Sequence, residues 1–536
     1  MAQKDIEQQL SQLIDVGLSL SAEKDSALLL EKILLTAKEI AHADGGTIYT
    51  LKDDKFLQMD IVRNDSLNIA MGGSSEQKTT FPPLPLYLEN GEPNFANVVS
   101  CALHYDTIID IKDRKQDDQF DFSGAQKFDD ETGYKSISFL TIPMKDHHGQ
   151  MIGALQLINA LDENGNTIPF SYKNALLVKS LTSQAAVALT NKNLIDELEQ
   201  LFESFIELIA DAIDEKSPYT GGHCRRVPEL TIMITNALHA NNDGPLKDFT
   251  MSDDDRYELK IAAWLHDCGK ITTPEYVVDK ATKLETIHDR IHEVDTRFEV
   301  IRRDLKIKLL EQQLAGTNDS TSTVEYSQTD YQNELDQLEI DQAFVRQHNT
   351  GGEFMTDEHQ KNADDIAQRY QITDFQGSTK NILFDDEVSN LQISRGTLND
   401  AERTIINRHI NMTIDMLTNL KLPKHLVNIP EIAGGHHERM DGKGYPNGLT
   451  REQMSIQARA MGIADIFEAL TAADRPYKKA KTLSESFSIM KRMKDTSHID
   501  PDIFDVFVRE GVFLDYAHKF LKAEQIDDVD VDQLLK

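Results

Sequence analysis

The sequence predicts a multidomain chain with an N-terminal α+β domain, a long linking helix and a C-terminal all-α domain that carries a helical insertion. Strand-like alternation of apolar and polar residues is confined to about residues 20–190, and an unbroken helical period runs through residues 176–214. Helical patterns then continue to the end, apart from one charged stretch rich in Gln and Asn. The 536 residues suffice for three or four domains at the usual size of about 150 residues each.

Composition and charge exclude several classes of protein. The formal net charge of −34 and the pI near 4.8 argue against nonspecific binding to DNA, RNA or anionic membranes. No stretch approaches the roughly 18 apolar residues of a membrane-spanning helix, and the opening MAQKDIEQQL lacks the apolar core of a signal peptide. The three cysteines lie far apart, unlike a disulfide framework. We therefore expect a reduced cytoplasmic protein whose partners include neither DNA nor a membrane.

The N-terminal part predicts helix, strands and helix in that order. Apolar residues three and four apart indicate an N-terminal helix over residues 1–20. GTIYTLKDDKFLQMDIV is typical of two strands joined by the polar turn at residues 52–55, and SISFLTIPMKDHHGQMIGALQLINAL of two strands around residues 147–149. Helix resumes near Asn174. This order describes one α+β domain over residues 20–190.

The linking helix over residues 176–214 has the sequence LLVKSLTSQAAVALTNKNLIDELEQLFESFIELIADAID. Its apolar positions recur every three or four residues without a break. Such a helix is either a coiled-coil stalk that joins two protomers or an amphipathic helix packed on its own domain. We favour the stalk, and with it a homodimer, because the helical pattern runs straight through the expected domain boundary.

A mostly helical domain is expected over residues 205–500, followed by a C-terminal helical tail over residues 500–536. Within it, residues from about 285–396 are charged, rich in Gln and Asn, and interrupted by the low-complexity segment GTNDSTSTVEYSQTD. We interpret this stretch as an inserted helical arm with a flexible tip. The arm is either a solvated decoration or a dimer contact or lid, and both interpretations stay open.

Two short motifs concentrate histidines and acidic residues. AWLHDCGKI places His266 beside Asp267, which suits a carboxylate that bridges two metals while its neighbour binds one. HHERMDGKGYP places His436 and His437 just before a tight Gly-Tyr-Pro turn. A lone histidine is more often a surface or core residue, but a set of imidazoles and carboxylates beside helix and turn signals favours iron, manganese or zinc over calcium. The candidate metal ligands are His223, His266, Asp267, His409, His436, His437 and Asp465.

The stretch from about 205 to 490 resembles the HD-GYP domains, a branch of the HD phosphohydrolase superfamily, through HDCGKI, HHERMDGKGYP and ADIFEALTAADRPYK. The resemblance implies an all-α fold, a centre of two or three metals and hydrolysis of cyclic di-GMP. Carried over by motif, it implies that the seven candidates bind the metals and that Asp267 and Lys270 are catalytic. It also implies a set of substrate contacts, namely Lys270, Tyr445, Arg475 and Lys478.

The sequence departs from the HD-GYP pattern in two places. The pattern stops at KATKL, which ends at Leu284, and resumes at GTLNDAERTIINRH, so His292 becomes a rival to His409 as a ligand. Family spacing favours His409, which comes eleven residues after Leu398. Tyr219 stands where members with a third metal carry a glutamate, so we expect two divalent ions, either iron or manganese.

The expected chemistry follows from these residue types. A phosphodiester is anionic and resists attack, and two metals can activate water and neutralise the charge that develops. Asp267 would bridge the metals, while Lys270 and Arg475 would clamp phosphate oxygens. Tyr445 would hydrogen-bond a phosphate or line the guanine pocket. Glu438 either supports a metal-bound imidazole or is simply solvated in its loop.

Residues 20–190 resemble a GAF domain through the order of elements and through KFDDETGYKSISFLTIPM. Residues 127–134 are similar to a segment of cyclic-nucleotide-binding GAF domains. This segment either belongs to a site for a small ligand such as a cyclic nucleotide or is a structural turn and strand, and both stay open. A ligand with different affinities for two arrangements of the stalk would set the activity of the enzyme.

The resemblances together imply a cytoplasmic, homodimeric, metal-dependent phosphodiesterase that hydrolyses cyclic di-GMP to pGpG and/or GMP under control of the GAF domain. One alternative is a hydrolase of another cyclic dinucleotide such as cyclic GMP-AMP. Another is a noncatalytic cyclic di-GMP receptor, against which the intact His266, Asp267 and Lys270 argue. Metal and substrate binding without turnover would favour the receptor.

Overall fold

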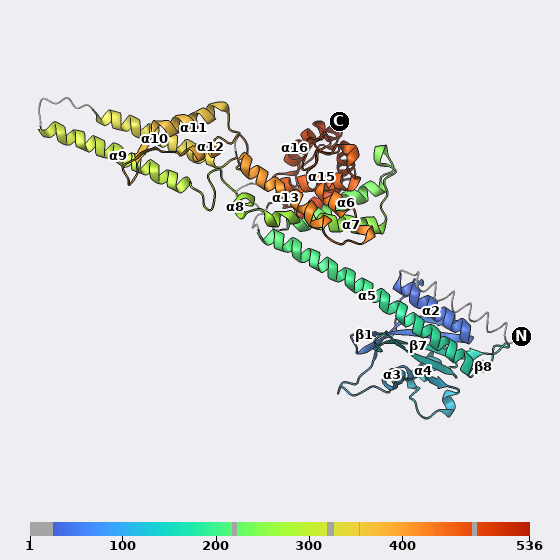
Figure 1. Ribbon diagram of the computed structural model, residues 1–536. Coiled ribbons are helices and arrows are strands. Elements are labelled where there is room, and N and C mark those ends of the chain that lie inside the picture. The colour runs from blue at the N-terminus through green and yellow to red at the C-terminus, as the bar shows by residue number, and fades with distance from the viewer. Residues whose placement is uncertain (1–24, 217–221, 319–325, 353, 474–479) are drawn as a thin grey trace. The chain divides into compact units, whose positions relative to one another are not determined.

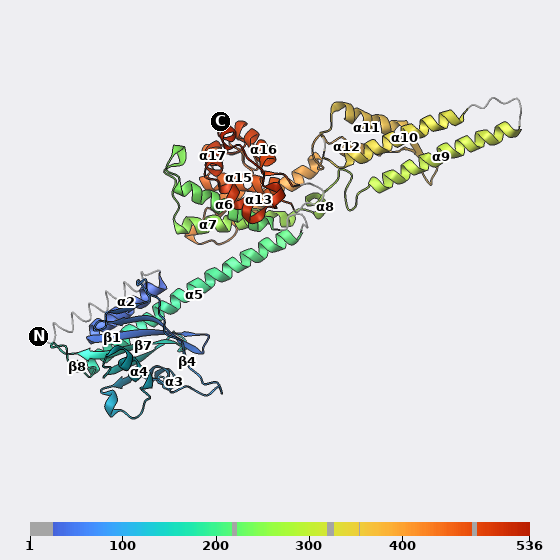
Figure 2. The same ribbon diagram turned by 180° about the vertical axis from the view of Figure 1, so that it is seen from behind.

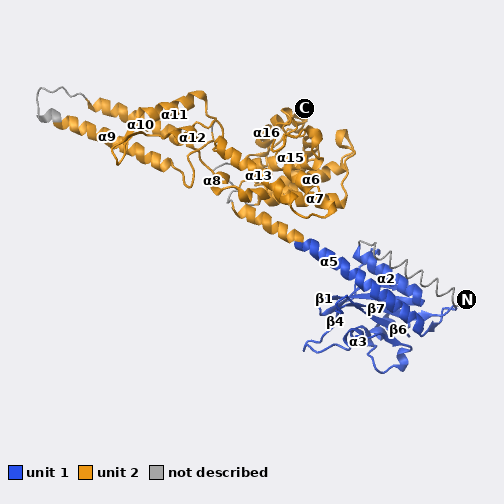
Figure 3. Ribbon diagram, in the orientation of Figure 1, with its two compact units in different colours: residues 1–201 blue, residues 202–536 orange. Residues whose placement is uncertain are grey.

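The structure is a computed structural model that describes residues 25–216, 222–318, 326–352, 354–473 and 480–536. The chain divides into two compact units, Met1–Leu201 and Phe202–Lys536 (Figure 3). The helix expected over residues 1–20 lies outside the described residues, as do Tyr219, Arg475 and Lys478. Every described helix is either too short or too polar to cross a lipid bilayer.

An antiparallel sheet forms the centre of the first unit, with the strand order β3-β2-β1-β7-β6-β5 and with β4 and β8 paired to β2 and β7. The strands are β1 (Ala43–Lys52), β2 (Phe56–Asn64), β3 (Ile69–Met71), β4 (Leu84–Pro85), β5 (Ile109–Ile111), β6 (Phe139–Lys145), β7 (Met151–Leu161) and β8 (Thr167–Ile168). Both predicted hairpins are present. Asp53 and Asp54, with φ angles of 51° and 55°, turn the chain between β1 and β2, and Gly149 (φ 80°) does so between β6 and β7.

The two faces of this sheet bury different side chains, because strand residues alternate between faces. The helices of the unit are α2 (Ser26–Ala41), α3 (Val98–Tyr105), α4 (Ser123–Thr132) and the first part of α5 (Tyr172–Lys216). Ile48 and Leu155 lie in an apolar core with α2 and α5. Tyr49 and Gln156 point to the other face, on which α3 and α4 lie (Figures 1 and 2). Each fully buried aliphatic side chain in this core stabilises the fold by roughly 1.5–3 kcal/mol.

Helix α5 has 45 residues and changes environment along its length. Val178 and Leu181 are buried in the core of the first unit, whereas Ile206 and Ile213 are buried in the core of the second. Five apolar side chains with exposed fractions of 48–66% follow a spacing of four and three residues, namely Leu194, Leu198, Leu201, Phe205 and Leu208. This spacing is the a and d pattern of a coiled coil. The helix therefore packs on its own chain at both ends and also presents an exposed apolar stripe.

The second unit consists mainly of helices around one large apolar core. Outside the insertion these are α6 (His223–Ala240), α7 (Asp253–Leu265), α8 (Glu275–Val278), α13 (Asp400–Thr418), α14 (Ile429–Gly434), α15 (Ile456–Thr471), α16 (Leu483–Asp495), α17 (Pro501–Arg509), α18 (Val512–Phe520) and α19 (Val531–Leu534). Phe507 on α17 and Tyr516 on α18 pack against Phe467 on α15, with ring centroids 5.1 and 5.7 Å apart. The C-terminal helices therefore complete the core of this unit.

The insertion has a small core of its own, which includes Phe298, Leu338 and Ile366. Its elements are α9 (Ile291–Asn318), α10 (Gln328–Asn349), α11 (Asp357–Arg369), β9 (Gln371–Thr373), β10 (Thr379–Asn381) and α12 (Asp385–Leu391). The β9–β10 hairpin departs from the all-α expectation. It forms because the Asp374 carboxylate accepts main-chain N–H groups within the turn and Gly377 takes a φ of 81°.

Two buried lysines hold the ends of the insertion together. Lys280 Nζ donates to both carboxylate oxygens of Glu402 at 2.8 Å. Lys283 Nζ donates to the main-chain oxygens of Leu391 and Ile393, also at 2.8 Å. Because these contacts close the base of the arm, the helical domain continues from α8 to α13 across it.

Candidate metal centre

The seven candidate ligands come from separate elements of the second unit and meet in one place. His223 is the first residue of α6, His266 and Asp267 follow α7, His409 lies in α13, His436 and His437 follow α14, and Asp465 lies in α15. His409 is the histidine that the structure places beside Asp267, whereas the rival His292 is exposed near the start of α9 in the insertion.

Asp267 lies at the centre of this cluster and is 2% exposed. Its Oδ2 atom is 3.3 Å from His223 Nε2 and 3.2 Å from His266 Nε2. Its Oδ1 atom is 3.3 Å from His409 Nε2. Asp465 Oδ1 is 3.4 Å from His223 Nε2. One carboxylate thus faces imidazoles from three elements with both of its oxygens.

Several ligand atoms of the cluster are buried without any hydrogen-bond partner within the described ranges, namely Asp267 Oδ1, His409 Nε2 and His436 Nε2. A buried polar atom left without a partner costs about 1–3 kcal/mol. The possible ligand atoms of His223, His266 and Asp267 lie within 4.8 Å of one another, and so do those of His409, His436 and His437. Imidazole nitrogens and carboxylate oxygens with unused lone pairs fit divalent metal ions.

Main-chain carbonyls orient three of the imidazoles. His266 Nδ1 contacts the carbonyl oxygen of Ala263 at 2.7 Å, and His436 Nδ1 contacts that of Ala433 at 2.6 Å. His409 Nδ1 contacts the carbonyl oxygen three residues earlier in the same way. Because a carbonyl only accepts, each Nδ1 carries the proton and each Nε2 keeps a lone pair that points into the cluster.

His223 is oriented by a carboxylate that the sequence reading missed. Its Nδ1–H donates to Glu468 Oε2 at 2.6 Å, and Glu468 is 1% exposed. Arg226 binds the other oxygen of Glu468 at 2.6 Å. Glu468 comes three residues after Asp465 on α15, so the two carboxylates share one helix face. This three-residue spacing from Asp465 is the feature of the sequence from which Glu468 could have been predicted.

The buried charges shift the pKa values of the cluster. Burial raises the pKa of Asp267, but Lys270 and the adjacent imidazoles outweigh burial and hold this pKa well below its usual range. Burial lowers the pKa of His437 to about 4, and it lowers the pKa of His436 as well. Burial also lowers the pKa of His223, but the nearby carboxylates outweigh it and raise this pKa. Ionised carboxylates and neutral imidazoles are the forms that bind metals, and a metal would replace the proton of His223.

A cavity of about 240 Å³ adjoins the cluster, and Lys270, Asn407 and Tyr445 are among the residues that line it. Lys270 Nζ lies 2.5 Å from Asp267 Oδ2. The Tyr445 ring lies 4.8 Å from the His437 ring with an interplanar angle of 30°. An ammonium and a phenol thus face the same space as the ligand atoms, which suits an anionic substrate.

The Gly-Tyr-Pro loop has its own support. Glu438 is 5% exposed, and its carboxylate accepts the main-chain N–H groups of Asn447 at 2.7 Å and Leu449 at 2.9 Å. A Cβ atom on Gly444 would lie 2.4 Å from the main-chain nitrogen of Arg439, so the loop requires glycine there. Glu438 therefore holds the loop in place and is not merely solvated.

The end of α5 contacts two segments that carry candidate site residues, and the sequence reading missed this as well. Lys216 Nζ donates to main-chain carbonyl oxygens within residues 270–273, the shortest bond being 2.5 Å. The Asp214 carboxylate accepts the main-chain N–H groups on either side of His223, at 2.9 and 3.3 Å. Neither residue belongs to a motif, so only the fold reveals these contacts.

Comparison with known families supports two domains in this chain. The GAF domain family matches residues 25–189, and the HD domain family matches residues 382–503. The second match contains four of the candidate ligands and lacks His223, His266 and Asp267. These three precede the insertion, which separates the two halves of the site.

Curated relatives match about a fifth of this chain. A 3'3'-cGAMP-specific phosphodiesterase of Vibrio cholerae is 40% identical over 116 residues, which are 22% of this chain and 26% of that protein. A cyclic di-GMP phosphodiesterase of Pseudomonas aeruginosa is 38% identical over 115 residues, which are 21% of this chain and 26% of that protein. The chain thus spans about a quarter of the length of these relatives. The two matches together show a GAF domain followed by an HD domain in this chain, and part of the chain is similar to the named phosphodiesterases.

Proposed function

We propose that this chain is a metal-dependent phosphodiesterase that hydrolyses cyclic di-GMP to pGpG and/or GMP and is regulated by its GAF domain. The observation that carries the proposal is the set of buried candidate ligand atoms around Asp267 that have no hydrogen-bond partner among the described residues, next to a cavity lined by Lys270. The matched relatives support it, since they are named as phosphodiesterases for cyclic di-GMP or 3'3'-cGAMP.

In this proposal two divalent ions, iron or manganese, are held between the two halves of the site. The ligands are His223, His266, Asp267, His409, His436, His437 and Asp465. Asp267 would be the central ligand, since its two oxygens face different histidines. When bound, the ions supply the positive charge that activates water and offsets the charge developing on the phosphate.

Lys270 and Tyr445 act on the substrate side. Burial lowers the pKa of Lys270, but Asp267 outweighs it and raises this pKa, so Lys270 stays an ammonium that binds a phosphate oxygen. Burial and the nearby carboxylates raise the pKa of Tyr445, so it stays a phenol that can donate a hydrogen bond. Arg475 and Lys478, which lie outside the described residues, complete the proposed substrate contacts by motif.

Regulation and assembly form a second part of the proposal. The protein acts in the cytoplasm as a homodimer joined along the exposed stripe of α5. A small ligand of the GAF domain, for which the sequence resemblance indicates a cyclic nucleotide, changes the arrangement of α5. The end of α5 contacts the segments that carry His223 and Lys270, which gives the change a physical route to the site.

The test combines metal analysis of anaerobically purified protein with chromatography of the products formed from cyclic di-GMP. We expect two metals per chain and a linear product. Asp267→Ala is expected to abolish turnover and to lower the metal content, because it removes the central carboxylate. Asp364→Ala, on an exposed position of α11, is the control that should retain both. Full activity of Asp267→Ala would refute the proposal.

The second candidate function is hydrolysis of 3'3'-cGAMP, which is the named substrate of the relative with 40% identity. Parallel assays with both cyclic dinucleotides distinguish the two, and a much larger kcat/KM for 3'3'-cGAMP would replace the first proposal. Metal and substrate binding without turnover, after reconstitution with iron and manganese, would instead indicate a receptor.

A further inference from the structure

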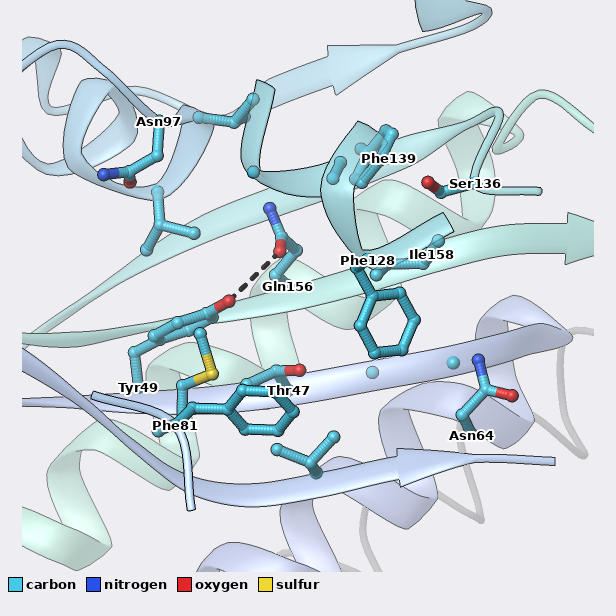
Figure 4. A pocket seen from close by; sticks show the side chains of 18 of the residues that line it. Thr47, Tyr49, Asn64, Phe81, Asn97, Phe128, Ser136, Phe139, Gln156 and Ile158 are labelled. Carbon is cyan, nitrogen blue, oxygen red and sulfur yellow. Dashed lines mark hydrogen bonds between the residues drawn. The ribbon is translucent and has the colours of Figure 1, made fainter. Parts of the chain in front are cut away.

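The GAF domain contains a cavity of about 360 Å³ on the face of the sheet opposite α2 and α5 (Figure 4). Its floor is formed by β1 and β7, and residues of α3, α4 and the loop that carries Phe81 form its walls. The volume lies within the roughly 300–1,000 Å³ of small-molecule sites. The cavity therefore has room for a ligand of one or two fused rings.

Several aromatic side chains line this cavity. Figure 4 shows Tyr49, Phe81, Phe128 and Phe139 around the space, together with the aliphatic Ile158. Aromatic pairs in stacked or edge-to-face geometry contribute about 0.5–1.5 kcal/mol beyond the area they bury. The walls therefore favour a flat ring system over a flexible or branched ligand.

The polar groups of the floor are neutral. Strand register places Gln156 opposite Thr47 on β1 and opposite Thr141 on β6. Gln156 Nε2 donates to Thr141 Oγ1 at 3.0 Å, whereas Gln156 Oε1 accepts from the Tyr49 hydroxyl only at 3.4 Å. Gln156 is 7% exposed, and its amide oxygen has lone-pair capacity left for a donor on a ligand. An amide and hydroxyls can recognise the polar edge of a heteroaromatic ring.

The described lining contains two cationic side chains, Arg63 and Lys127, and neither is available to bind a charged ligand inside the cavity. The Arg63 guanidinium donates to three main-chain carbonyls and to Glu31 at 2.6 Å. The Lys127 side chain is 78% exposed and lies 4.0 Å from Glu131. A phosphate bound inside would therefore gain no close partner of opposite charge from either residue.

Fixed negative charge lies behind one wall. Asp44 is 4% exposed and accepts the hydroxyl of Tyr134, a lining residue, at 2.5 Å. The N-terminus of α3 also faces the cavity, but a helix terminus supplies only about half an elementary charge. The Asn97 side chain there already accepts from Ser100. The partial charge of the helix terminus and the Asn97 side chain do not offset the free-energy cost of removing water from a phosphate anion.

We propose that the GAF cavity binds an uncharged, planar heteroaromatic compound, with its polar edge on Gln156 and its faces against Phe128 and Tyr49. The inference goes beyond the proposed hydrolase and does not depend on it. It departs from the cyclic nucleotide that the sequence resemblance indicates, because the described lining provides ring contacts and neutral hydrogen bonds but no site for a cyclic phosphate.

The test is calorimetric titration of the full chain with indole, adenine, adenosine and cyclic AMP. Adenine, adenosine and cyclic AMP share the same fused ring system. Cyclic AMP differs from adenosine by its charged phosphate. We expect saturable binding of at least one neutral ring and no binding of cyclic AMP. Cyclic AMP binding tighter than adenosine would overturn the proposal, and so would failure of all three neutral compounds to bind at concentrations up to about 1 mM.

Two variants locate the binding. Gln156→Leu keeps the bulk of the side chain and removes the amide, and Phe128→Ala removes one ring of the wall. Each is expected to weaken binding of the neutral ring about tenfold, which corresponds to about 1.4 kcal/mol. Phe95→Ala is the control, since Phe95 is a 43% exposed ring in the same domain and outside the cavity lining. Unchanged affinity in both cavity variants would overturn the assignment to this site.

Discussion

The imidazoles of the metal centre differ in the group that holds their Nδ1 atoms. His266, His409 and His436 donate to main-chain carbonyls, whereas His223 donates to the buried carboxylate of Glu468. An anionic partner makes an imidazole a stronger base and a stronger metal ligand than a carbonyl does. Glu468 is therefore a positioning residue that also sets the strength of one ligand.

Glu468→Gln is expected to weaken metal binding about 10- to 100-fold. The amide can still accept from His223, but it lacks the negative charge. Competition between the protein and a metal-binding dye measures this affinity directly. Glu452→Gln, at an exposed position after the Gly-Tyr-Pro loop, is the matched control and should bind metal as the parent does. A Glu468→Gln affinity equal to that of the control would contradict the role of Glu468.

The residues that carry motifs could be predicted, and those that support them could not. HDCGKI and HHERMDGKGYP indicate His266, Asp267 and His436 as candidates, because adjacent histidines and acidic residues form a recognisable pattern in the sequence. Glu468 contacts a histidine 245 positions away, and no local pattern reports such a contact. The roles of the site residues stay predictions until they are tested by substitution.

Among the structural elements, the insertion offers a pH-dependent contact at its base. Lys283 is 1% exposed, and burial lowers its pKa from 10.5 to about 8. The unfolded chain keeps this proton up to about pH 10.5, whereas the folded chain releases it near pH 8. Between these values the unfolded state binds more protons, so the contribution of Lys283 to stability rises with pH. Below pH 8 both states are protonated, and the full cost of burying the charge applies.

The free energy of unfolding is therefore expected to include a term that increases from pH 8 to pH 9.5. Lys283→Met should remove this term, so the difference in stability between parent and variant should change across the range. Urea denaturation at several pH values provides the measurement. Lys361→Met, at an exposed position on α11, should follow the parent. Parallel pH profiles of the parent and Lys283→Met would count against the shifted pKa.

Elements with a strong repeating pattern were predictable, and the shortest ones were not. The hairpins around residues 52–55 and 147–149 combine alternating strands with polar turns, and both are confirmed. The long helix runs over Tyr172–Lys216, slightly beyond the predicted 176–214. Strands β9 and β10 have three residues each, too few to show a period of two, so a helical arm was expected there.

At the scale of the whole molecule, the exposed stripe of α5 bears on assembly. Leu198, Leu201, Phe205 and Leu208 are more than half exposed, although they are large apolar side chains. Their spacing of three and four places them on one side of the helix, and Asn191 continues the pattern toward the N-terminus. A second copy of the same helix would cover this stripe, which is the basis of the proposed homodimer.

Leu201→Glu is expected to shift the protein from dimer to monomer. The change places a charge at the centre of the stripe in both chains and forfeits about 2 kcal/mol of burial per chain, so the dissociation constant should rise by roughly a thousandfold. Analytical ultracentrifugation measures the effect. Glu199→Gln, on an exposed neighbouring position off the stripe, is the control. A parent protein that sediments as a monomer at all concentrations would refute the dimer.

The insertion also delays the synthesis of the second half of the candidate metal centre relative to the first half. The candidate ligands His223, His266 and Asp267 are translated before the arm, and the next candidate, His409, follows about 140 residues after Asp267. At about 5–20 residues per second, a ribosome needs roughly 7–28 s to synthesise that stretch. During this interval only three of the seven candidate ligands have been synthesised, so a complete metal site cannot yet form. The arm has a core of its own around Phe298 and can therefore acquire structure before the centre is complete.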